Sequence, residues 1–228
     1  MLNTLIIKFS NKISPLEIPL FRGAVISAMG DNVNVLFHNH EGSGYRFRYP
    51  MIQYKRIGGK AAIVCVGEGT EHIGEFFIAN NFKLKLGDRR EEAFEIDAVL
   101  PRRTKVQVWD GCFDYWLRGW LPLNPDNYQR YMKCSDKELR TSMLEHILVG
   151  NILSAFKGLG ICVERKIECR ISDQEAPRTV YYKDLPMLSM DCQFKTNITL
   201  PDYIGLGKGA SMGHGVIFRI RNNAKYDE

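Results

Sequence analysis

The sequence predicts an α+β fold made of two tandem ferredoxin-like domains with antiparallel sheets and a C-terminal glycine-rich loop. Over the first half of the chain, patterns typical of strands and helices follow one another in the order β-α-β-β-α-β, which is the ferredoxin-like plan. A similar but less regular order follows. The chain has 228 residues, which is long enough for two domains of about 100 residues. We expect the domains to cover residues 1–108 and 109–228.

Local signals place the elements of the first domain. Ser14, Pro15 and Glu17 form a capping box with proline at the first helical position, which predicts the start of a helix. Gly58 and Gly59 separate two strand-like runs, as in a tight hairpin. RNA-recognition modules (RRM) share this plan, although a fold alone does not determine a function. The expected elements are a strand at 2–9, helices at 15–29 and 70–80, the second capped by Thr70, and strands at 45–55, 60–67, 82–86 and 93–109.

The second domain repeats this order less cleanly. Ser135 and Glu138 form another capping box, and an apolar stripe at helical spacing continues to about Lys157. We therefore expect a degenerate copy of the first domain. Its expected elements are a helix ending near 157 and strands at 113–120, 161–171, 179–183, 187–200 and 215–221.

Composition narrows the class of protein. Apolar residues make up 45% of the chain and charged residues 25%, and the net charge of +5 permits an anionic partner without requiring one. No stretch approaches the ~20 apolar residues of a membrane span, and the N-terminus lacks the features of a signal peptide. We expect a cytoplasmic protein that does not bind membranes. The six cysteines form no CxxC motif, which argues against a disulfide framework or a zinc ribbon.

A dense run of glycines precedes the last predicted strand. Glycine permits positive φ and close backbone approach, so this loop is expected to present N–H groups to a phosphate. A Walker A loop would need Ser or Thr after Gly-Lys and then a helix, and a dinucleotide fingerprint would open a βαβ unit. A flexible hairpin connection is the plainer alternative. The expected ligand-binding residues of the loop are Gly205, Gly207, Lys208, Gly209, Gly213, His214 and Gly215.

Two segments carry a resemblance to a known family. One is Phe-His-Asn-His at 37–40 followed by Tyr-Arg-Phe-Arg-Tyr-Pro at 45–50, and the other is the Gly-x-Gly-x-Gly-x3-Gly-x-Gly loop. Together they resemble the CRISPR-associated endoribonucleases of the repeat-associated mysterious protein superfamily, and the likeness covers the whole chain in element order. It implies metal-independent cleavage of CRISPR repeat RNA, no cofactor, and guide RNAs that effector complexes of other CRISPR-associated proteins carry.

Metal-free RNA cleavage needs a group that deprotonates the 2′-hydroxyl, a group that protonates the departing 5′-oxygen, and stabilisation of the charge between them. Histidine suits both proton transfers because its pKa of about 6.5 lies near neutral pH. In an extended segment His38 and His40 would point the same way, and we expect them to divide the two roles. Tyr45 is expected to bind a phosphate oxygen or orient the nucleophile, and Lys55 to supply positive charge.

Basic residues extend the predicted RNA site. Arg46 and Arg48 alternate with Phe47, which places their charges on one face of a strand and suits a track for phosphates. The central hypothesis is that the histidine pair and the glycine-rich loop converge on one ribose-phosphate unit.

Three alternatives stay open at this point. The chain could be a non-catalytic RNA-binding subunit of an effector complex. His38 and His40 could instead bind zinc, with Glu41 as the nearest third ligand, although we expect no metal. Either histidine could simply cap the loop.

Overall fold

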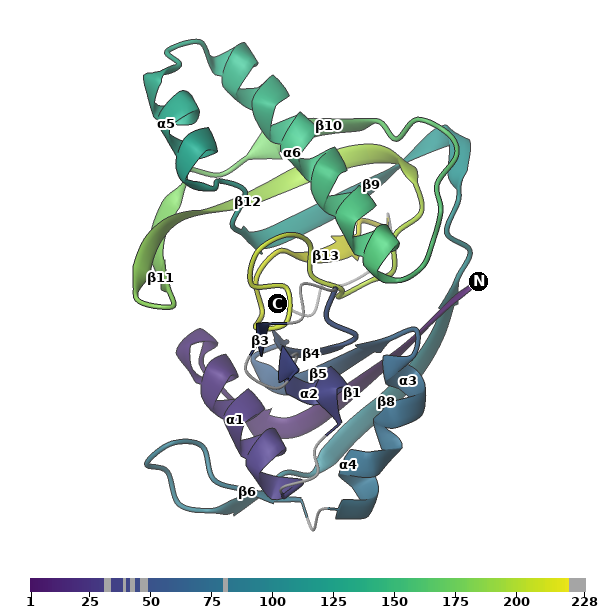
Figure 1. Cartoon of the computed structure of the whole chain (residues 1–228), viewed down its shortest axis with the longest axis vertical. Helices are drawn as coiled ribbons and strands as arrows, with labels where there is room; N and C mark the ends of the chain where they lie inside the picture. Colours follow the sequence, from purple (N-terminus) through teal and green to yellow (C-terminus); the bar gives the residue numbers. More distant parts are fainter. Residues whose placement is uncertain (31–33, 39, 42–43, 46–48, 80–81, 222–228) are drawn as a thin grey trace. The chain divides into compact units, whose positions relative to one another are not determined.

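The computed structural model describes residues 1–30, 34–38, 40–41, 44–45, 49–79 and 82–221 (Figure 1). For residues 38, 40–41, 44–45 and 79 the structure describes only the backbone. The chain divides into two compact units. The first contains Met1–Thr104 together with Ser211–Gly213, and the second contains Lys105–Ala210 and the described residues from His214 onward.

The first unit contains a four-stranded sheet in the order β4-β5-β1-β8, and every neighbouring pair is antiparallel. This is the ferredoxin-like strand order, with β2–β3 and β6–β7 as additional short ladders. The elements are β1 (Leu2–Lys12), η1 (Pro15–Glu17), α1 (Ile18–Ala28), α2 (Val35–His38), β2 (His40–Glu41), β3 (Gly44–Tyr45), β4 (Ile52–Ile57), β5 (Lys60–Val66), α3 (Gly69–His72), α4 (Gly74–Ala79), β6 (Lys83–Leu84), β7 (Glu92–Ala93) and β8 (Ile96–Thr104).

Local sequence signals explain two of these boundaries. The Ser14 N–H donates to Glu17 Oε2 at 2.7 Å, so the first helix begins where the capping box predicts it, with one 3₁₀ turn before α1. Gly58 and Gly59 have φ of +58° and +77° and join β4 to β5. Positive φ at both positions matches the right-handed twist of a two-residue hairpin.

The second helical region differs from the prediction. It forms two short helices, α3 and α4, and α3 begins at Gly69. Thr70 is therefore not the cap, because it already lies within the first turn, where its hydroxyl donates to the Gly67 carbonyl at 2.8 Å.

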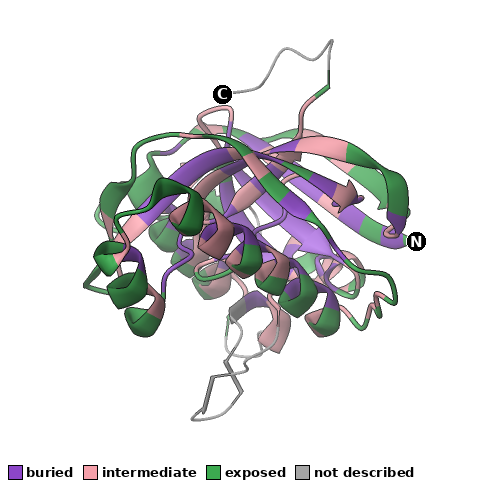
Figure 2. Cartoon of the chain, turned by 90° about the horizontal axis from the view of Figure 1, so that it is seen from above, coloured by how far each residue is buried: buried purple, intermediate pink, exposed green. Residues whose placement is uncertain are grey.

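Aromatic side chains fill the core of the first unit. Phe21 stacks on Phe94 with ring centroids 5.5 Å apart and meets Phe9 and Tyr54 edge-on at 5.7 and 5.9 Å. Each such pair contributes about 0.5–1.5 kcal/mol beyond the area it buries. Figure 2 shows buried residues along several strands, whereas exposed residues lie on helices, loops and parts of other strands.

The second unit contains a sheet in the order β10-β12-β9-β13, with β11 added alongside β12. In chain order these four strands again give the ferredoxin-like arrangement, so the predicted tandem fold is confirmed. The elements are β9 (Val108–Trp120), α5 (Pro125–Lys133), α6 (Lys137–Gly158), β10 (Cys169–Gln174), β11 (Arg178–Tyr182), β12 (Leu185–Ile198) and β13 (Val216–Arg219).

The glycine-rich loop stands where the ferredoxin-like plan has its second helix. The connection from β12 to β13 covers residues 199–215, all described, and contains no helix. This missing helix makes the second unit the irregular one. Across the described ranges, no helix combines the length and apolar character that crossing a membrane requires.

The start of α6 differs by one residue from the prediction. Asp136 is the cap, because its Oδ1 accepts hydrogen bonds from the N–H groups of Glu138 and Leu139 at 2.8 and 3.2 Å. Ser135 therefore lies outside the helix.

Candidate functional site

The predicted catalytic histidines lie in a segment that changes structure between them. Helix α2 ends at His38, and strand β2 begins at His40 and pairs with Tyr45. The expectation of one extended segment is wrong, because His38 belongs to a helical turn. The side chains of these three residues, and Arg46 and Arg48 entirely, lie outside what the structure describes.

One strand residue links this segment to the glycine-rich loop. The hydroxyl of Tyr54 in β4 donates to the carbonyl of Phe37, the residue before His38, at 3.2 Å. The Tyr54 N–H donates to the Ser211 carbonyl at 2.8 Å, and Met212 forms a parallel bridge to Tyr54. Within the first unit, residues 211–212 of the loop and the end of α2 therefore contact the same residue.

Tyr54 suits this role because it is completely buried. Burial raises the pKa of its hydroxyl, so the group stays protonated and remains a donor. A buried hydroxyl that lost its acceptor would cost about 1–3 kcal/mol, which favours the bonded arrangement.

The base of the glycine-rich loop is closed by backbone contacts. Gly205 bridges to Val216, and the Leu206 N–H donates to the Gly215 carbonyl at 2.8 Å. Gly215 has a φ of +61°, and a methyl group there would overlap the Leu206 carbonyl oxygen. Both Gly205 and Gly215 are buried. We therefore assign these two glycines to holding the loop closed, rather than to the direct RNA contact that the sequence suggested.

The exposed part of the loop is Gly207 and Lys208. Gly207 has a φ of +77° and lies against the hydrogen bond between Trp120 Nε1 and Asn151 Oδ1, which is 2.9 Å long. A side chain at this position would collide with the Asn151 amide. Sequence reasoning missed Asn151, and a polar residue within the apolar stripe of α6 is the signal that could have found it.

His214 is packed inside the loop rather than projecting freely. Its Nδ1 lies 3.2 Å from the Gly119 carbonyl oxygen, and its ring meets Tyr182 edge-on at 5.5 Å. Gly209 lies directly against this imidazole. Gly209, Gly213 and His214 are all half-buried, so only part of each is open to a ligand.

A β-bulge in β9 forms a backbone hydrogen bond to the base of the glycine-rich loop. Gly119 has a φ of +61° at a register shift between β9 and β12. Its N–H donates to Asp191 Oδ1 at 2.6 Å, and its carbonyl accepts the Gly215 N–H at 3.1 Å. Arg178 pairs with the other Asp191 oxygen at 2.6 Å. Sequence reasoning missed Gly119 and Asp191, although a glycine within the expected strand at 113–120 is a signal that could have indicated the bulge.

Lys55 lies on β4 directly after Tyr54. Successive strand side chains point to opposite faces, so Lys55 lies on the face of β4 away from the core cluster that contains Tyr54 and Phe37. It is fully buried, and burial lowers its pKa to about 7. The amine is therefore neutral in a large fraction of molecules at neutral pH.

This buried amine should make stability depend on pH. The folded-state pKa lies below the unfolded value, so between pH about 7 and about 10.4 the unfolded state binds the extra proton and the free energy of unfolding rises with pH. Over that window the gain should be on the order of 4 kcal/mol, and Lys55→Met should remove it. Urea unfolding from pH 7 to pH 10 measures this. Lys60→Met, at the exposed Lys60–Asp97 pair, is the control. An unchanged slope in Lys55→Met would refute the assignment.

Comparison with known proteins decides the family. Residues 1–102 match the model of the Cas6b N-terminal domain, and residues 107–220 match that of the Cas6b C-terminal domain. The chain belongs to the Cas6b family. The resemblance read from the two sequence segments is thereby confirmed.

Solved structures agree with the Cas6b assignment. A crystal structure of Cas6b is similar with a TM-score of 0.86 and 25% identity, over 96% of this chain and 100% of that one. A crystal structure of the CRISPR RNA processing endoribonuclease Cas6b has a TM-score of 0.73 at 24% identity, over 96% and 99% of the two chains, and it supports the fold.

A sequence relative is an uncharacterized protein of Methanocaldococcus jannaschii. It is 36% identical over 105 residues, which cover 46% of this chain and 70% of that protein.

Proposed function

We propose that this Cas6b protein is an endoribonuclease that cleaves CRISPR repeat RNA by attack of a 2′-hydroxyl on the adjacent phosphate. The reaction needs no metal ion and leaves a 2′,3′-cyclic phosphate. Membership of the Cas6b family supports the substrate, since one solved Cas6b is named a CRISPR RNA processing endoribonuclease. The observation that carries the proposal is the double contact of Tyr54, which joins Ser211 of the loop to Phe37, the residue before His38.

The chemistry follows from the groups around that contact. His38 and His40 divide the roles of general base and general acid, one removing the 2′-hydroxyl proton and the other protonating the 5′-oxygen as its bond to phosphorus breaks. Tyr45, opposite His40 in the β2–β3 ladder, binds a phosphate oxygen or orients the nucleophile. Lys55 remains a candidate for positive charge, although it lies on the other face of β4.

The glycine-rich loop supplies RNA binding. Its exposed residues Gly207 and Lys208 offer backbone N–H groups and a cation to a phosphate. The half-buried Gly209, Gly213 and His214 flank them. Arg46 and Arg48 are proposed to continue the phosphate track.

A cleavage assay with mapped ends tests the mechanism. Labelled repeat RNA should be shortened in excess EDTA, and the upstream product should end in a 2′,3′-cyclic phosphate. A single deoxy nucleotide before the scissile bond should stop cleavage, because the nucleophile is then absent, while binding persists. A strict requirement for magnesium would refute the mechanism. RNA that shifts on a gel without being shortened would instead identify a non-catalytic binding subunit.

A further inference from the structure

Helix α2, which ends at His38, is held at its N-terminus by hydrogen bonds to Asn34. The Asn34 side-chain oxygen accepts the Leu36 N–H at 3.0 Å, and its carbonyl accepts the Phe37 N–H at 3.0 Å. These bonds satisfy donors that a helix leaves open at its N-terminus. Asn34 is therefore the cap of this single helical turn.

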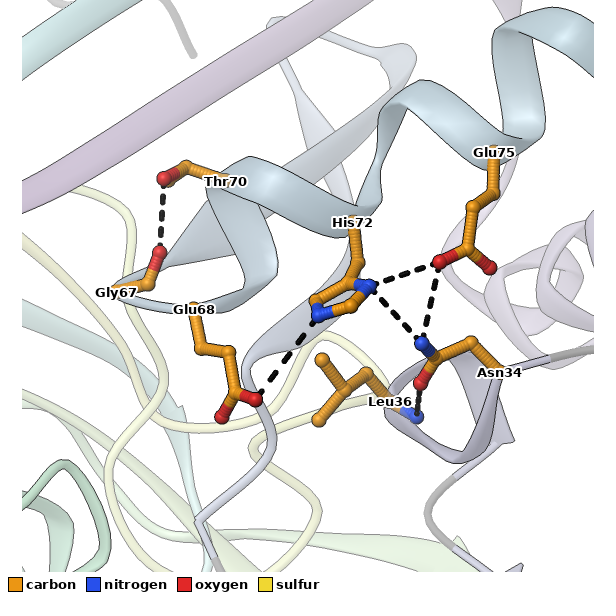
Figure 3. Close-up of polar contacts among 7 residues, drawn as sticks. All are labelled: Asn34, Leu36, Gly67, Glu68, Thr70, His72 and Glu75. Atoms are coloured by element: carbon orange, nitrogen blue, oxygen red, sulfur yellow. Dashed lines mark hydrogen bonds and ion pairs between the residues drawn. The ribbon is translucent and has the colours of Figure 1, made fainter.

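The same side chain also reaches two other helices. Its amide Nδ2 donates to Glu75 Oε1 of α4 at 3.2 Å and lies 3.0 Å from His72 Nδ1 of α3 (Figure 3). His72 Nδ1 is in turn 2.8 Å from the same Glu75 oxygen, and its Nε2 is 3.9 Å from Glu68 Oε1. Since one ring nitrogen cannot donate and accept at once, a proton on Nδ1 leaves Glu75 as the acceptor for both His72 and Asn34.

The other end of α2 is held by Tyr54, whose hydroxyl donates to the Phe37 carbonyl. A helix of four residues has little stability of its own, because it barely exceeds the costly nucleating turn. Its position must then come from tertiary contacts. Phe37 supplies one of them, since its side chain is buried in the apolar core of the first unit. The polar contacts described at the two ends of the helix are those of the Asn34 side chain and the Tyr54 hydroxyl.

We propose that Asn34 and Tyr54 are positioning residues that together fix the place of His38, with the His72–Glu75 pair as the anchor for Asn34. The proposal rests on the proposed function, in which His38 transfers a proton. Such a group must lie within about 2.6–3.2 Å of the atom it serves. A displacement of about 1 Å costs on the order of 100-fold in rate. Loss of either contact should therefore slow the chemical step without weakening RNA binding.

The test measures single-turnover cleavage with protein in excess, together with the Kd for uncleaved deoxy-substituted RNA. Asn34→Ala removes the cap and the amide, Asn34→Asp keeps the capping oxygen but replaces the donor facing Glu75, and Tyr54→Phe removes only the hydroxyl. Each should cleave about tenfold more slowly or worse, with Kd changed by less than about twofold.

Two matched variants separate positioning from general destabilisation. Asn124→Ala removes an equivalent cap, since Asn124 Oδ1 accepts the Asn127 N–H at the start of α5. Tyr115→Phe removes a fully buried hydroxyl bonded to the Leu200 backbone. Both should lower Tm about as much as their counterparts and leave the cleavage rate within about twofold.

The outcomes are distinct. Wild-type rates in Asn34→Asp and Tyr54→Phe, or rate losses matched by the two control variants, would overturn the positioning roles. If His38→Ala itself cleaves normally, the proposed function fails at that residue. If His38→Ala is inactive while the Asn34 and Tyr54 variants are fast, only the positioning inference fails. Should Asn34→Ala not fold, Asn34→Asp and Tyr54→Phe decide the question.

Discussion

Replacing His38 and His40 together with alanine is expected to abolish cleavage of repeat RNA while leaving its binding nearly intact. General acid and general base catalysis are each worth about 10²–10⁴-fold, so the double variant should lose at least about 10⁴-fold in single-turnover rate. RNA binding should persist, because the proposed phosphate contacts lie in the loop and the basic residues. Single-turnover assays and gel-shift titrations measure the two quantities.

His146→Ala is the matched control for the histidine pair. His146 lies on the exposed side of α6, where its Nδ1 is 2.7 Å from the Ser142 carbonyl oxygen. Its loss should not alter cleavage. Normal cleavage by the His38/His40 double variant would place the catalytic groups elsewhere, and equal loss of binding and rate would make the pair a binding element instead.

The second large effect is expected for Gly215→Ala. Gly215 has a φ of +61°, and the new methyl group would overlap a backbone carbonyl rather than a movable side chain. The loop base would have to open, which should destabilise the protein by about 2–4 kcal/mol. Because the base sets the shape of the exposed loop, RNA affinity should fall at least about tenfold. Thermal unfolding and RNA titration check both values.

Gly150→Ala adds the same methyl group, but the expected effect on stability is the opposite. Gly150 lies inside α6 with nothing within 4 Å of an added methyl group. Alanine should therefore stabilise this helix by up to about 1 kcal/mol and leave RNA affinity unchanged. A Gly215→Ala variant that binds RNA like the Gly150→Ala variant would show that loop geometry does not govern binding.

Features encoded by neighbouring residues could be predicted from the sequence. The capping box at Ser14 and the Gly58–Gly59 turn are local, and both form as expected. At the start of α6, Ser135 and the adjacent Asp136 are both residue types that can cap a helix. In the structure Asp136 accepts the hydrogen bonds from the first turn. The turn that contains His38 is too short for a periodic pattern, so the hypothesis for the histidine pair assumed an extended segment there.

Features that join distant residues could not be predicted in this way. Nothing near Asn34 in the sequence indicates that its amide meets Glu75. The burial of Lys55 likewise depends on the folded sheet, so its residue type and proximity suggested a cation where the structure places a buried amine whose pKa is lowered to about 7 by burial. The glycine-rich loop was recognisable from composition, but the division between its buried base and exposed tip depends on pairing with Val216 and Gly119.

The contact between Tyr54 and Ser211 has a consequence for how the protein is made. The two residues are separated by more than half of the chain, so they meet only after the ribosome has produced most of the polypeptide. The amino-terminal sheet can fold early, since its strands are complete by Thr104. A nascent chain halted before the glycines would then carry both histidines and still lack the segment that contacts Tyr54, so under the proposed function ribosome-bound intermediates should leave repeat RNA uncut.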